Sequence, residues 1–414
     1  MKLNRRIMQA LVAIMMFSTL YYMNFIIGKY DQIPYIHEIL QRLMYTYPDN
    51  KLSNGMKNIT SPFGKTYVAH NCTRREYVFD NTANISSNDN TIPTIFMYEK
   101  HPLDWFTAFN IKDKGCTTCL FTSDSKFYNM SKVVIFFRTL IKPPPEKLAG
   151  QIWVYFTNES PTYMVSPTNI AWTKSMSKFD WVMSYRPGSD IIVPFGVLTK
   201  KENRNKLNYT KIFKEKKKEI AWIVSHCETN SKRKEYVKEL QKYIQVDIYG
   251  GCGNLSCQQQ HPVKISSDLN ICKSYISQNY KFYLSFENSL CNNYVSEKVY
   301  DIFEDDNMML PVIRGAPNIA SVLPDGTFIT TSNFTSPKQL AAFLAKIGSS
   351  EKEYTSYLKK KHSYSVTNWA FNFKTAICDL CTRIKNEKLV NKKINVYDRL
   401  KEDRCFKPSD IIHE

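Results

Sequence analysis

Short apolar runs separated by polar segments recur through most of the chain and predict alternating strands and helices. In the first half, these runs predict strands at 94–98, 132–137, 152–156 and 181–185. In the second half, they predict strands at 220–225, 245–249, 282–286, 310–313 and 327–330. Apolar residues at helical spacing predict helices at 231–244, 297–305 and 336–347. Such alternation is typical of a largely parallel sheet with helices on both faces.

A Lys-rich stretch at 200–218 separates the two halves and is typical of a solvated linker. We therefore expect two Rossmann-like α/β domains that face a cleft. The first is expected at 92–199 and the second at 200–362, and residues 363–414 add a C-terminal helix and a tail.

The N-terminus has the pattern of a membrane anchor. Arg5 and Arg6 precede an apolar run at 7–27, and about 20 residues is the length that a helix needs to cross a bilayer. A cleaved signal peptide is the alternative, but bulky residues such as Tyr21 stand where a small-residue cleavage site belongs. We expect a cytoplasmic tail at 1–6, a retained transmembrane signal anchor and a lumenal remainder, which is a type II topology.

Residues 28–91 are polar, show little periodicity and are expected to form a stem. The N-x-S/T sequons, which mark N-glycosylation in secreted proteins, lie at Asn58, Asn71, Asn84, Asn129, Asn158, Asn208, Asn254 and Asn333. The 11 cysteines also fit an oxidising compartment.

The formal net charge of +18 favours anionic partners such as nucleic acid, an anionic membrane or a phosphorylated substrate. A lumenal location makes nucleic acid a poor candidate. The phosphates of a nucleotide sugar are the better match.

The stretch 280–298 carries the most informative candidate site. A predicted strand ends at Phe286, and a polar loop leads into a helix whose first turn contains Glu297 and Lys298. In doubly wound sheets, ligands bind beyond the carboxyl ends of strands, against helix N-termini that favour anions. Glu297 could then bind sugar hydroxyls, whereas the alternative is a solvated first turn in which Glu complements the helix dipole.

Two further charged residues are candidates with an ordinary alternative. Arg233 begins the helix after the 220–225 strand, so it can point into the cleft or be a surface arginine. Glu159 follows the 152–156 strand, and a carboxylate at a strand end is placed to act as a general base. Its alternative is an exposed loop position.

Patterns that would hold a metal ion are weak. The chain has no Asp-x-Asp, the pattern expected where a divalent ion holds a nucleotide-sugar diphosphate. Two C-x-x-C segments, with Cys116 and Cys119 and with Cys378 and Cys381, have zinc-site spacing. In an oxidising lumen, disulfides are the favoured interpretation.

Several long motifs, in order, resemble the α1,3-fucosyltransferases, type II Golgi enzymes with a two-Rossmann-domain (GT-B) fold. The most specific is FYLSFENSLCNNYVSEK, which is similar to the family's FYLAFENS…DYxTEK block and is followed by LPVIRGAPNIASVLP and FTSPKQLAAFL. Upstream, NESPTY, WVMSYRPGSDIIVPFG and KEIAWIVS…VDIYGGCG resemble further family motifs. The resemblance covers roughly residues 92–385.

The resemblance implies roles for matching residues. Glu159 matches the family's proposed general base. Donor-binding positions are matched by Ser225, Arg233, Asn288, Tyr294, Glu297 and Lys298. The family's donor site needs no metal, so we expect no metal-binding residues there and at most stimulation by a divalent cation. Family disulfides imply that Cys378 and Cys381 pair with N-terminal cysteines, with Cys116 and Cys119 as plausible partners, which would return the last helix to the N-terminal domain.

The sequence departs from the family pattern mainly on the acceptor side. His226 stands where many relatives have Asn. Phe136-Phe137-Arg138-Thr139 replaces a His-His-Trp-Asp stretch, and Arg186-Pro187-Gly188 lacks the usual Asp. These changes favour the innermost GlcNAc of an N-glycan as acceptor, with N-acetyllactosamine and LacdiNAc as alternatives.

The resemblance implies that the chain moves L-fucose from GDP-fucose to the 3-OH of GlcNAc in glycoprotein glycans, with inversion, as a Golgi membrane protein. A homodimer held through the stem or transmembrane segment is a further expectation. The alternative is a catalytically silent lumenal protein that binds glycans or assists another transferase. Such a protein would be expected to lack Glu159, Arg233 or Lys298, and all three are present.

Overall fold

The computed structural model describes residues 59–60, 66–67, 93–98, 109–110, 119–137, 146–164, 176–202, 207–256, 269–386, 394–401 and 405–411. Residues 48–414 belong to one unit of the chain. The predicted tail at 1–6 and the predicted anchor at 7–27 lie outside the described residues. Among the helices that the structure describes, none combines the length and apolar character needed to cross a bilayer.

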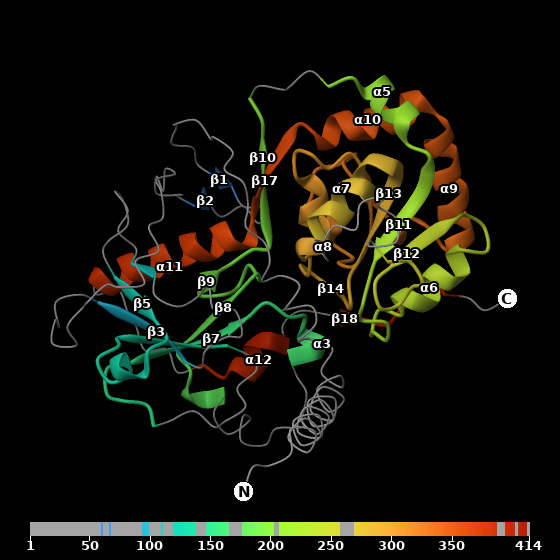
Figure 1. Ribbon diagram of the computed structural model, residues 1–414. Helices are drawn as coiled ribbons and strands as arrows, with labels where there is room; N and C mark the ends of the chain where they lie inside the picture. Colours follow the sequence, from blue (N-terminus) through green and yellow to red (C-terminus); the bar gives the residue numbers. More distant parts are fainter. Residues whose placement is uncertain are drawn as a thin grey trace, which may run out of the picture. The chain divides into compact units, whose positions relative to one another are not determined.

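The first half of the chain builds a seven-stranded sheet that is parallel except at one edge (Figure 1). Its strands, in spatial order, are β4 (Phe109–Asn110), β5 (Leu120–Thr122), β3 (Thr94–Tyr98), β6 (Val133–Phe137), β7 (Ile152–Thr157), β8 (Trp181–Ser184) and β9 (Ile191–Ile192). Strands β6 and β7 lie in the middle and are almost entirely buried.

The second half builds a five-stranded sheet in which every pairing is parallel. Its strands, in spatial order, are β12 (Val246–Tyr249), β11 (Lys218–Ile223), β13 (Tyr280–Phe286), β15 (Leu310–Arg314) and β16 (Ile329–Thr330). The strand order reverses between β11 and β13. In doubly wound sheets, ligands bind at such a switch point, beyond the carboxyl ends of the strands.

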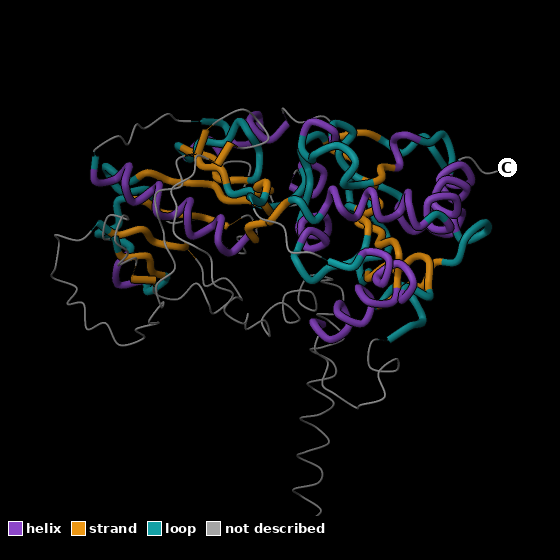
Figure 2. Tube along the Cα trace, turned by 90° about the horizontal axis from the view of Figure 1, so that it is seen from above, coloured by secondary structure: helices purple, strands orange, loops and turns teal. Residues whose placement is uncertain are grey.

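Helices cover both faces of the five-stranded sheet, as Figure 2 shows. Phe282 and Leu284 of β13 pack into a core with helices α6 (Arg233–Leu240), α9 (Pro337–Ser349) and α10 (Glu351–Lys361). On the opposite face, Ala221 of β11 and Tyr283 of β13 belong to a second core with Ile276 of helix α7 (Leu269–Asn279). This alternation along the strands confirms the predicted parallel α/β arrangement.

The last part of the chain returns to the seven-stranded sheet. Strand β17 (Tyr364–Asn368) pairs antiparallel with β10 (Gly196–Lys200). Helix α11 (Trp369–Lys385) follows, and Phe373 on it contacts Phe121 and Phe156. On the other face of that sheet, Val396 of helix α12 (Val396–Lys401) packs with Tyr155. The remaining described pairs are β1 (Ile59–Thr60) with β2 (Thr66–Tyr67), and β14 (Leu290–Cys291) with β18 (Cys405–Phe406).

Three predicted segments differ from the structure. The stretch 200–218 is not only a linker, because helix α5 (Tyr209–Glu215) lies within it and packs Ile212 and Phe213 against the core. The helix predicted at 297–305 is shorter. Helix α8 (Glu297–Tyr300) gives way to one 3₁₀ turn (Asp301–Phe303), and the acidic residues that follow would oppose a longer helix dipole.

The helix predicted at 231–244 is also shorter, since α6 spans only Arg233–Leu240. Its start is delayed because Lys232 adopts a left-handed backbone conformation, with φ of 52°. This conformation is rare outside glycine and turns the chain just before Arg233.

Candidate active site

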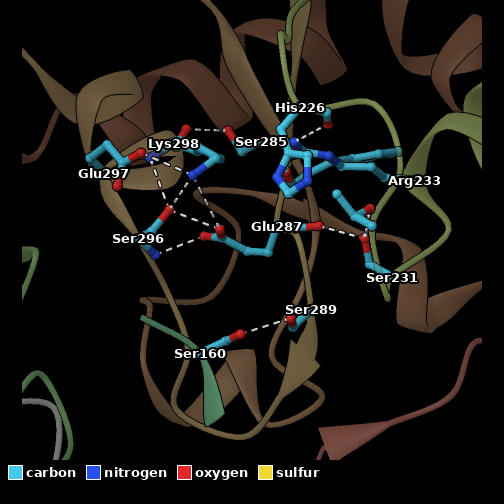
Figure 3. Close-up of polar contacts among 12 residues, drawn as sticks. Ser160, His226, Ser231, Arg233, Ser285, Glu287, Ser289, Ser296, Glu297 and Lys298 are labelled. Atoms are coloured by element: carbon cyan, nitrogen blue, oxygen red, sulfur yellow. Dashed lines mark hydrogen bonds and ion pairs between the residues drawn. The ribbon is translucent and has the colours of Figure 1, made fainter. Parts of the chain in front are cut away.

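Glu159 lies two residues beyond the end of strand β7 and is 6% exposed, which excludes the exposed-loop alternative. Its backbone N–H donates to Thr157 Oγ1 at 3.2 Å and closes a tight turn at the strand end. The next residue, Ser160, is fully buried, and its hydroxyl lies 2.8 Å from the hydroxyl of Ser289 in the loop after β13 (Figure 3). The segment around Glu159 is therefore held against the loop that follows β13.

The Glu159 carboxyl has a strongly shifted pKa. The pKa of Glu159 is raised from 4.5 to about 7, mainly by burial, and the charges of Glu297 and Glu287 act in the same direction. The Lys298 ammonium and a hydrogen bond from the Asn288 side chain lower it. The structure thus brings the predicted base together with three predicted donor-site residues, and a carboxyl with a pKa near 7 suits proton transfer at neutral pH.

The loop between β13 and α8 is organised by Glu287, which is fully buried. Its Oε1 accepts from the backbone N–H of Ser296 at 2.7 Å, and its Oε2 accepts from the Ser296 hydroxyl at 2.8 Å (Figure 3). Burial raises the pKa of Glu287. Because Ser296 is the N-cap of α8, Glu287 fixes the start of the helix that carries Glu297 and Lys298.

Lys298 supplies a cation at this point. Its Nζ lies 2.9 Å from Glu297 Oε1, 3.2 Å from Ser296 Oγ and 3.7 Å from Glu287 Oε2. The Lys298 side chain remains 28% exposed, so it can still meet a ligand.

Free amides that attract an anion at the start of this helix stay a prediction. The Lys298 N–H donates to Ser296 Oγ, and α8 has only four residues, too few to build a substantial macrodipole. Side-chain charge is therefore the stronger attraction for an anion here.

Arg233 is 4% exposed, so the surface-arginine alternative is excluded. Its Nη1 donates to the carbonyl of Phe286 and its Nη2 to the carbonyl of His226, both at 2.7 Å. These two carbonyls lie beyond the ends of β13 and β11. The guanidinium is therefore fixed at the switch point of the five-stranded sheet.

Ser225 and His226 follow strand β11. Ser225 is exposed, and its hydroxyl accepts from the Gly251 N–H at 3.4 Å rather than joining the Glu159 cluster. The His226 ring lies 5.9 Å from the ring of Tyr163 in the short helix α3 (Pro161–Met164). Burial raises the pKa of Tyr163, and both Arg233 and Glu159 act on it, so its phenol lies near both groups.

Tyr294 is 3% exposed and packs against Tyr185, with ring centroids 5.4 Å apart. Burial raises its pKa well above the usual value, and the charges of Glu159, Glu287 and Glu297 act in the same direction. Tyr294 therefore borders the same carboxylate cluster.

Three residues of the site, Tyr163, Glu287 and Ser289, are not among those predicted from the sequence. Tyr163 stands within the NESPTY motif, but nothing in its spacing shows that it meets His226. Glu287 carried a usable signal, because it is a carboxylate that directly follows a buried strand. Ser289 carried none, since its contact with Ser160 joins distant parts of the chain.

A small cavity lies beyond β8, the strand that pairs with β7. Arg186 follows β8 as Glu159 follows β7, because Thr157 pairs with Ser184 in parallel register. The Arg186 N–H donates to Ser184 Oγ in a matching turn. Arg186 lines a cavity of about 110 Å³ together with Asn293 and Arg399.

The predicted disulfides are present where the structure describes them. Cys119 pairs with Cys381, which joins the start of β5 to helix α11. Cys378 is disulfide-bonded too, and Cys116 lies outside the described residues. Among the described pairs, Cys227 with Cys252 and Cys291 with Cys405 were not predicted, and Cys272 is disulfide-bonded as well.

Several sequons lie on described surfaces. Asn129, Asn208, Asn254 and Asn333 are exposed. Asn158 is half-buried next to Glu159, and the sequons at Asn58, Asn71 and Asn84 lie outside the described residues. Across the part of the chain that the structure describes, no group of three or more His, Cys, Asp or Glu residues could hold a metal ion.

Two family models match the chain. Residues 90–196 match the N-terminal fucosyltransferase model, and residues 213–402 match the C-terminal model of glycosyltransferase family 10 (fucosyltransferase). The chain belongs to this family, the fucosyltransferases, whose members are glycosyltransferase enzymes.

Individual relatives are similar over part of their length. The chain is 31% identical over 264 residues to alpha-(1,3)-fucosyltransferase C of Drosophila melanogaster, with 59% of this chain and 58% of the relative covered. It is 33% identical over 237 residues to glycoprotein 3-alpha-L-fucosyltransferase A of the same species, covering 56% and 44%. It is 30% identical over 287 residues to the human 4-galactosyl-N-acetylglucosaminide 3-alpha-L-fucosyltransferase FUT6, covering 66% and 73%. The chain thus spans about half the length of the two fruit-fly relatives.

Among solved structures, an alpha1,3-fucosyltransferase crystallised with GDP-fucose is similar at a TM-score of 0.42 and 15% identity. The match covers 69% of this chain and 89% of that one.

Proposed function

We propose that the chain is an α1,3-fucosyltransferase with GT-B architecture. It transfers L-fucose from GDP-β-L-fucose to the 3-hydroxyl of a GlcNAc residue in a glycoprotein glycan, with inversion. The observation that carries the proposal is the buried Glu159 carboxyl, with its pKa raised to about 7, beside Asn288, Glu297 and Lys298. Membership of the fucosyltransferase family supports it.

In the proposed reaction, Glu159 accepts the proton of the acceptor hydroxyl. The hydroxyl oxygen forms a bond to the anomeric carbon of fucose as the bond from that carbon to the diphosphate oxygen breaks. GDP departs with the bonding electron pair, on the face opposite to the attack, so the configuration inverts. Holding the acceptor and the base together lowers the entropic part of the barrier.

In this proposal, positively charged side chains bind the donor diphosphate. Lys298 lies on α8 and Arg233 at the start of α6, and their charges stabilise the negative charge that develops on the leaving group. Asn288 and Glu297 are suited to fucose hydroxyls, and Tyr294 and Ser225 complete the donor side. The donor site works without a metal ion, and a divalent cation at most stimulates it.

The acceptor binds on the Glu159 side, close to the cavity that Arg186 lines. We favour the innermost GlcNAc of an N-glycan, with N-acetyllactosamine and LacdiNAc as alternatives. The names of the relatives point in both directions, since one is a glycoprotein fucosyltransferase and another a 4-galactosyl-N-acetylglucosaminide fucosyltransferase. A Golgi location, a type II anchor at 7–27 and a homodimer through the stem or anchor belong to the same proposal.

A transfer assay tests the proposal. The purified full-length chain is incubated with GDP-fucose and a panel that contains a core N-glycan, N-acetyllactosamine and LacdiNAc. We expect one acceptor to gain a fucose on the 3-hydroxyl of GlcNAc, as located by mass spectrometry of permethylated products. GDP binding without transfer to any member of the panel would contradict the enzymatic assignment and support the silent alternative.

A further inference from the structure

The C-terminal segment 405–411 lies beyond the residues that match the family models, which end at 402. Strand β18 within it pairs antiparallel with β14, with Cys405 opposite Cys291 and Phe406 opposite Leu290 (Figure 1). A disulfide joins Cys405 to Cys291, and Cys291 is fully buried. The segment is therefore attached, covalently and through the backbone, to the loop between β13 and α8.

The same segment makes a second attachment through Asp410. Its carboxylate accepts from Nη1 of Arg314 at 2.5 Å and from Nη2 at 2.9 Å, a two-pronged ion pair. Arg314 is 1% exposed at the end of β15, and its guanidinium lies 4.3 Å from the Tyr236 ring. Bidentate pairs of this kind fix geometry as well as charge.

Arg314 connects Asp410 to the predicted donor side through Ser231. Its Nε and Nη2 donate to the carbonyl of Ser231 at 3.2 and 3.1 Å. Ser231 in turn donates its backbone N–H to the carbonyl of Asn288 at 3.0 Å and its hydroxyl to the carbonyl of Glu287 at 2.6 Å (Figure 3). Ser231 also stands two residues before Arg233. The contacts of Asp410 thus lead to both loops that carry predicted donor-binding residues.

We propose that segment 405–411, here called the C-terminal strap, positions the GDP-fucose site and that Asp410 is a positioning residue for donor binding. This inference rests on the proposed function. The two attachments, at Cys291 and at Arg314, converge on the loop that runs from Glu287 to Ser296 and on the start of α6. Loss of the Asp410 charge leaves the Arg314 cation buried without its carboxylate, a costly state that the loops relieve by moving.

The first test replaces Asp410 by Asn in the full-length chain. We expect the KM for GDP-fucose to rise by roughly tenfold, because loosened positioning weakens donor contacts that depend on geometry. The KM for the acceptor and kcat per folded molecule stay within about twofold. A purely structural role would lower the folded fraction and leave both KM values alone, so unchanged donor KM overturns the proposal.

Asp305→Asn is the matched control. Asp305 also forms an ion pair with a cation, Lys201 at 2.6 Å, but its side chain is 70% exposed. The same chemical change there should leave the KM for GDP-fucose unaltered. An equal rise in both variants would show that loss of charge, rather than the strap, is responsible.

A second variant and a second readout make the strap testable even if Asp410→Asn does not fold or the chain shows no transferase activity. The double variant Cys291→Ala/Cys405→Ala removes the covalent attachment. Hydrogen exchange measured by mass spectrometry should become faster, by about tenfold or more, in peptides that cover 287–296 and 231–236. Unchanged exchange there refutes the strap. Absence of transfer by the wild-type chain refutes the proposed function instead.

Discussion

The carboxyl of Glu159, which follows strand β7, lies close enough to the Lys298 ammonium on helix α8 for that charge to lower its pKa. Glu159 follows a strand of the seven-stranded sheet, and Lys298 lies on the helix that follows β13 and β14. Burial raises the pKa of Glu159 by more than the ammonium lowers it, so the pKa is about 7. A carboxyl that is partly protonated at neutral pH and a cation that is partly exposed thus lie close together, which suits the proposed transfer to an acceptor hydroxyl.

Lys298→Ala should weaken GDP binding by about tenfold to a hundredfold, because the diphosphate loses a charge-assisted contact. Isothermal titration calorimetry measures the affinity. Lys346→Ala is the control, since Lys346 is 70% exposed on α9. Equal affinity of Lys298→Ala and wild type would remove Lys298 from the donor site.

The raised pKa of Glu159 predicts a specific effect of pH on stability. Between pH 4.5 and about 7, the folded protein keeps a proton on Glu159 that the unfolded chain has released. The stability that this proton contributes is present at low pH and is lost as the pH rises through 7. Glu159→Gln cannot lose stability in this way. The difference in unfolding free energy between Glu159→Gln and wild type should therefore shift by about 3 kcal/mol in favour of the variant between pH 4.5 and pH 8. Thermal melts of both proteins at the two pH values measure this, and a pH-independent difference would contradict the burial of an ionisable Glu159.

Glu287→Gln tests the part of the site that sequence reasoning missed. A Gln amide presents N–H groups to one of the two Ser296 donors, which leaves a buried group unpaired at a cost of about 1–3 kcal/mol. The start of α8 should loosen and the KM for GDP-fucose rise by roughly tenfold. Steady-state kinetics measure this KM. Glu228→Gln is the control, because the Glu228 side chain is 74% exposed. A normal donor KM would show that Glu287 does not position Lys298.

The Cys119–Cys381 disulfide closes a loop of 262 residues, whereas Cys227–Cys252 closes one of 25. Replacing the first pair by Ala should lower the free energy of unfolding by about 2–5 kcal/mol. The chain-entropy account makes this loss about 2 kcal/mol larger than that for the second pair. Denaturant titrations of the two double variants compare them, and a larger loss for the short loop would go against the entropic explanation.

The strands were predictable because burial on both faces leaves continuous apolar runs, as in β3 and β7. The antiparallel pair β10 and β17 gave no such run, since both strands are mostly half-buried. Helix α5 was hidden because lysines surround the apolar positions Ile212 and Phe213. Helix α8 was overestimated because Ile302 and Phe303 continue its apolar spacing through a 3₁₀ turn.

The candidate site could be predicted only in part, because some of its contacts join residues that are far apart in the sequence. Residues at strand ends, such as Glu159 and Arg233, could be placed from the order of elements. The environment that sets the Glu159 pKa depends on Asn288 and Glu287, which meet it only after the chain has folded. The pairing of Cys291 with Cys405 likewise depends on a distance in space that spacing along the chain does not encode.

The most direct test of the central claim compares turnover and GDP affinity in Glu159→Gln. The substitution keeps the size of the side chain but removes its ability to accept a proton. The account predicts that kcat falls by about 10²-fold or more while the dissociation constant for GDP stays within about twofold of wild type. Near-normal turnover, or a loss of GDP affinity as large as the loss of kcat, would contradict the assignment of Glu159 as the general base.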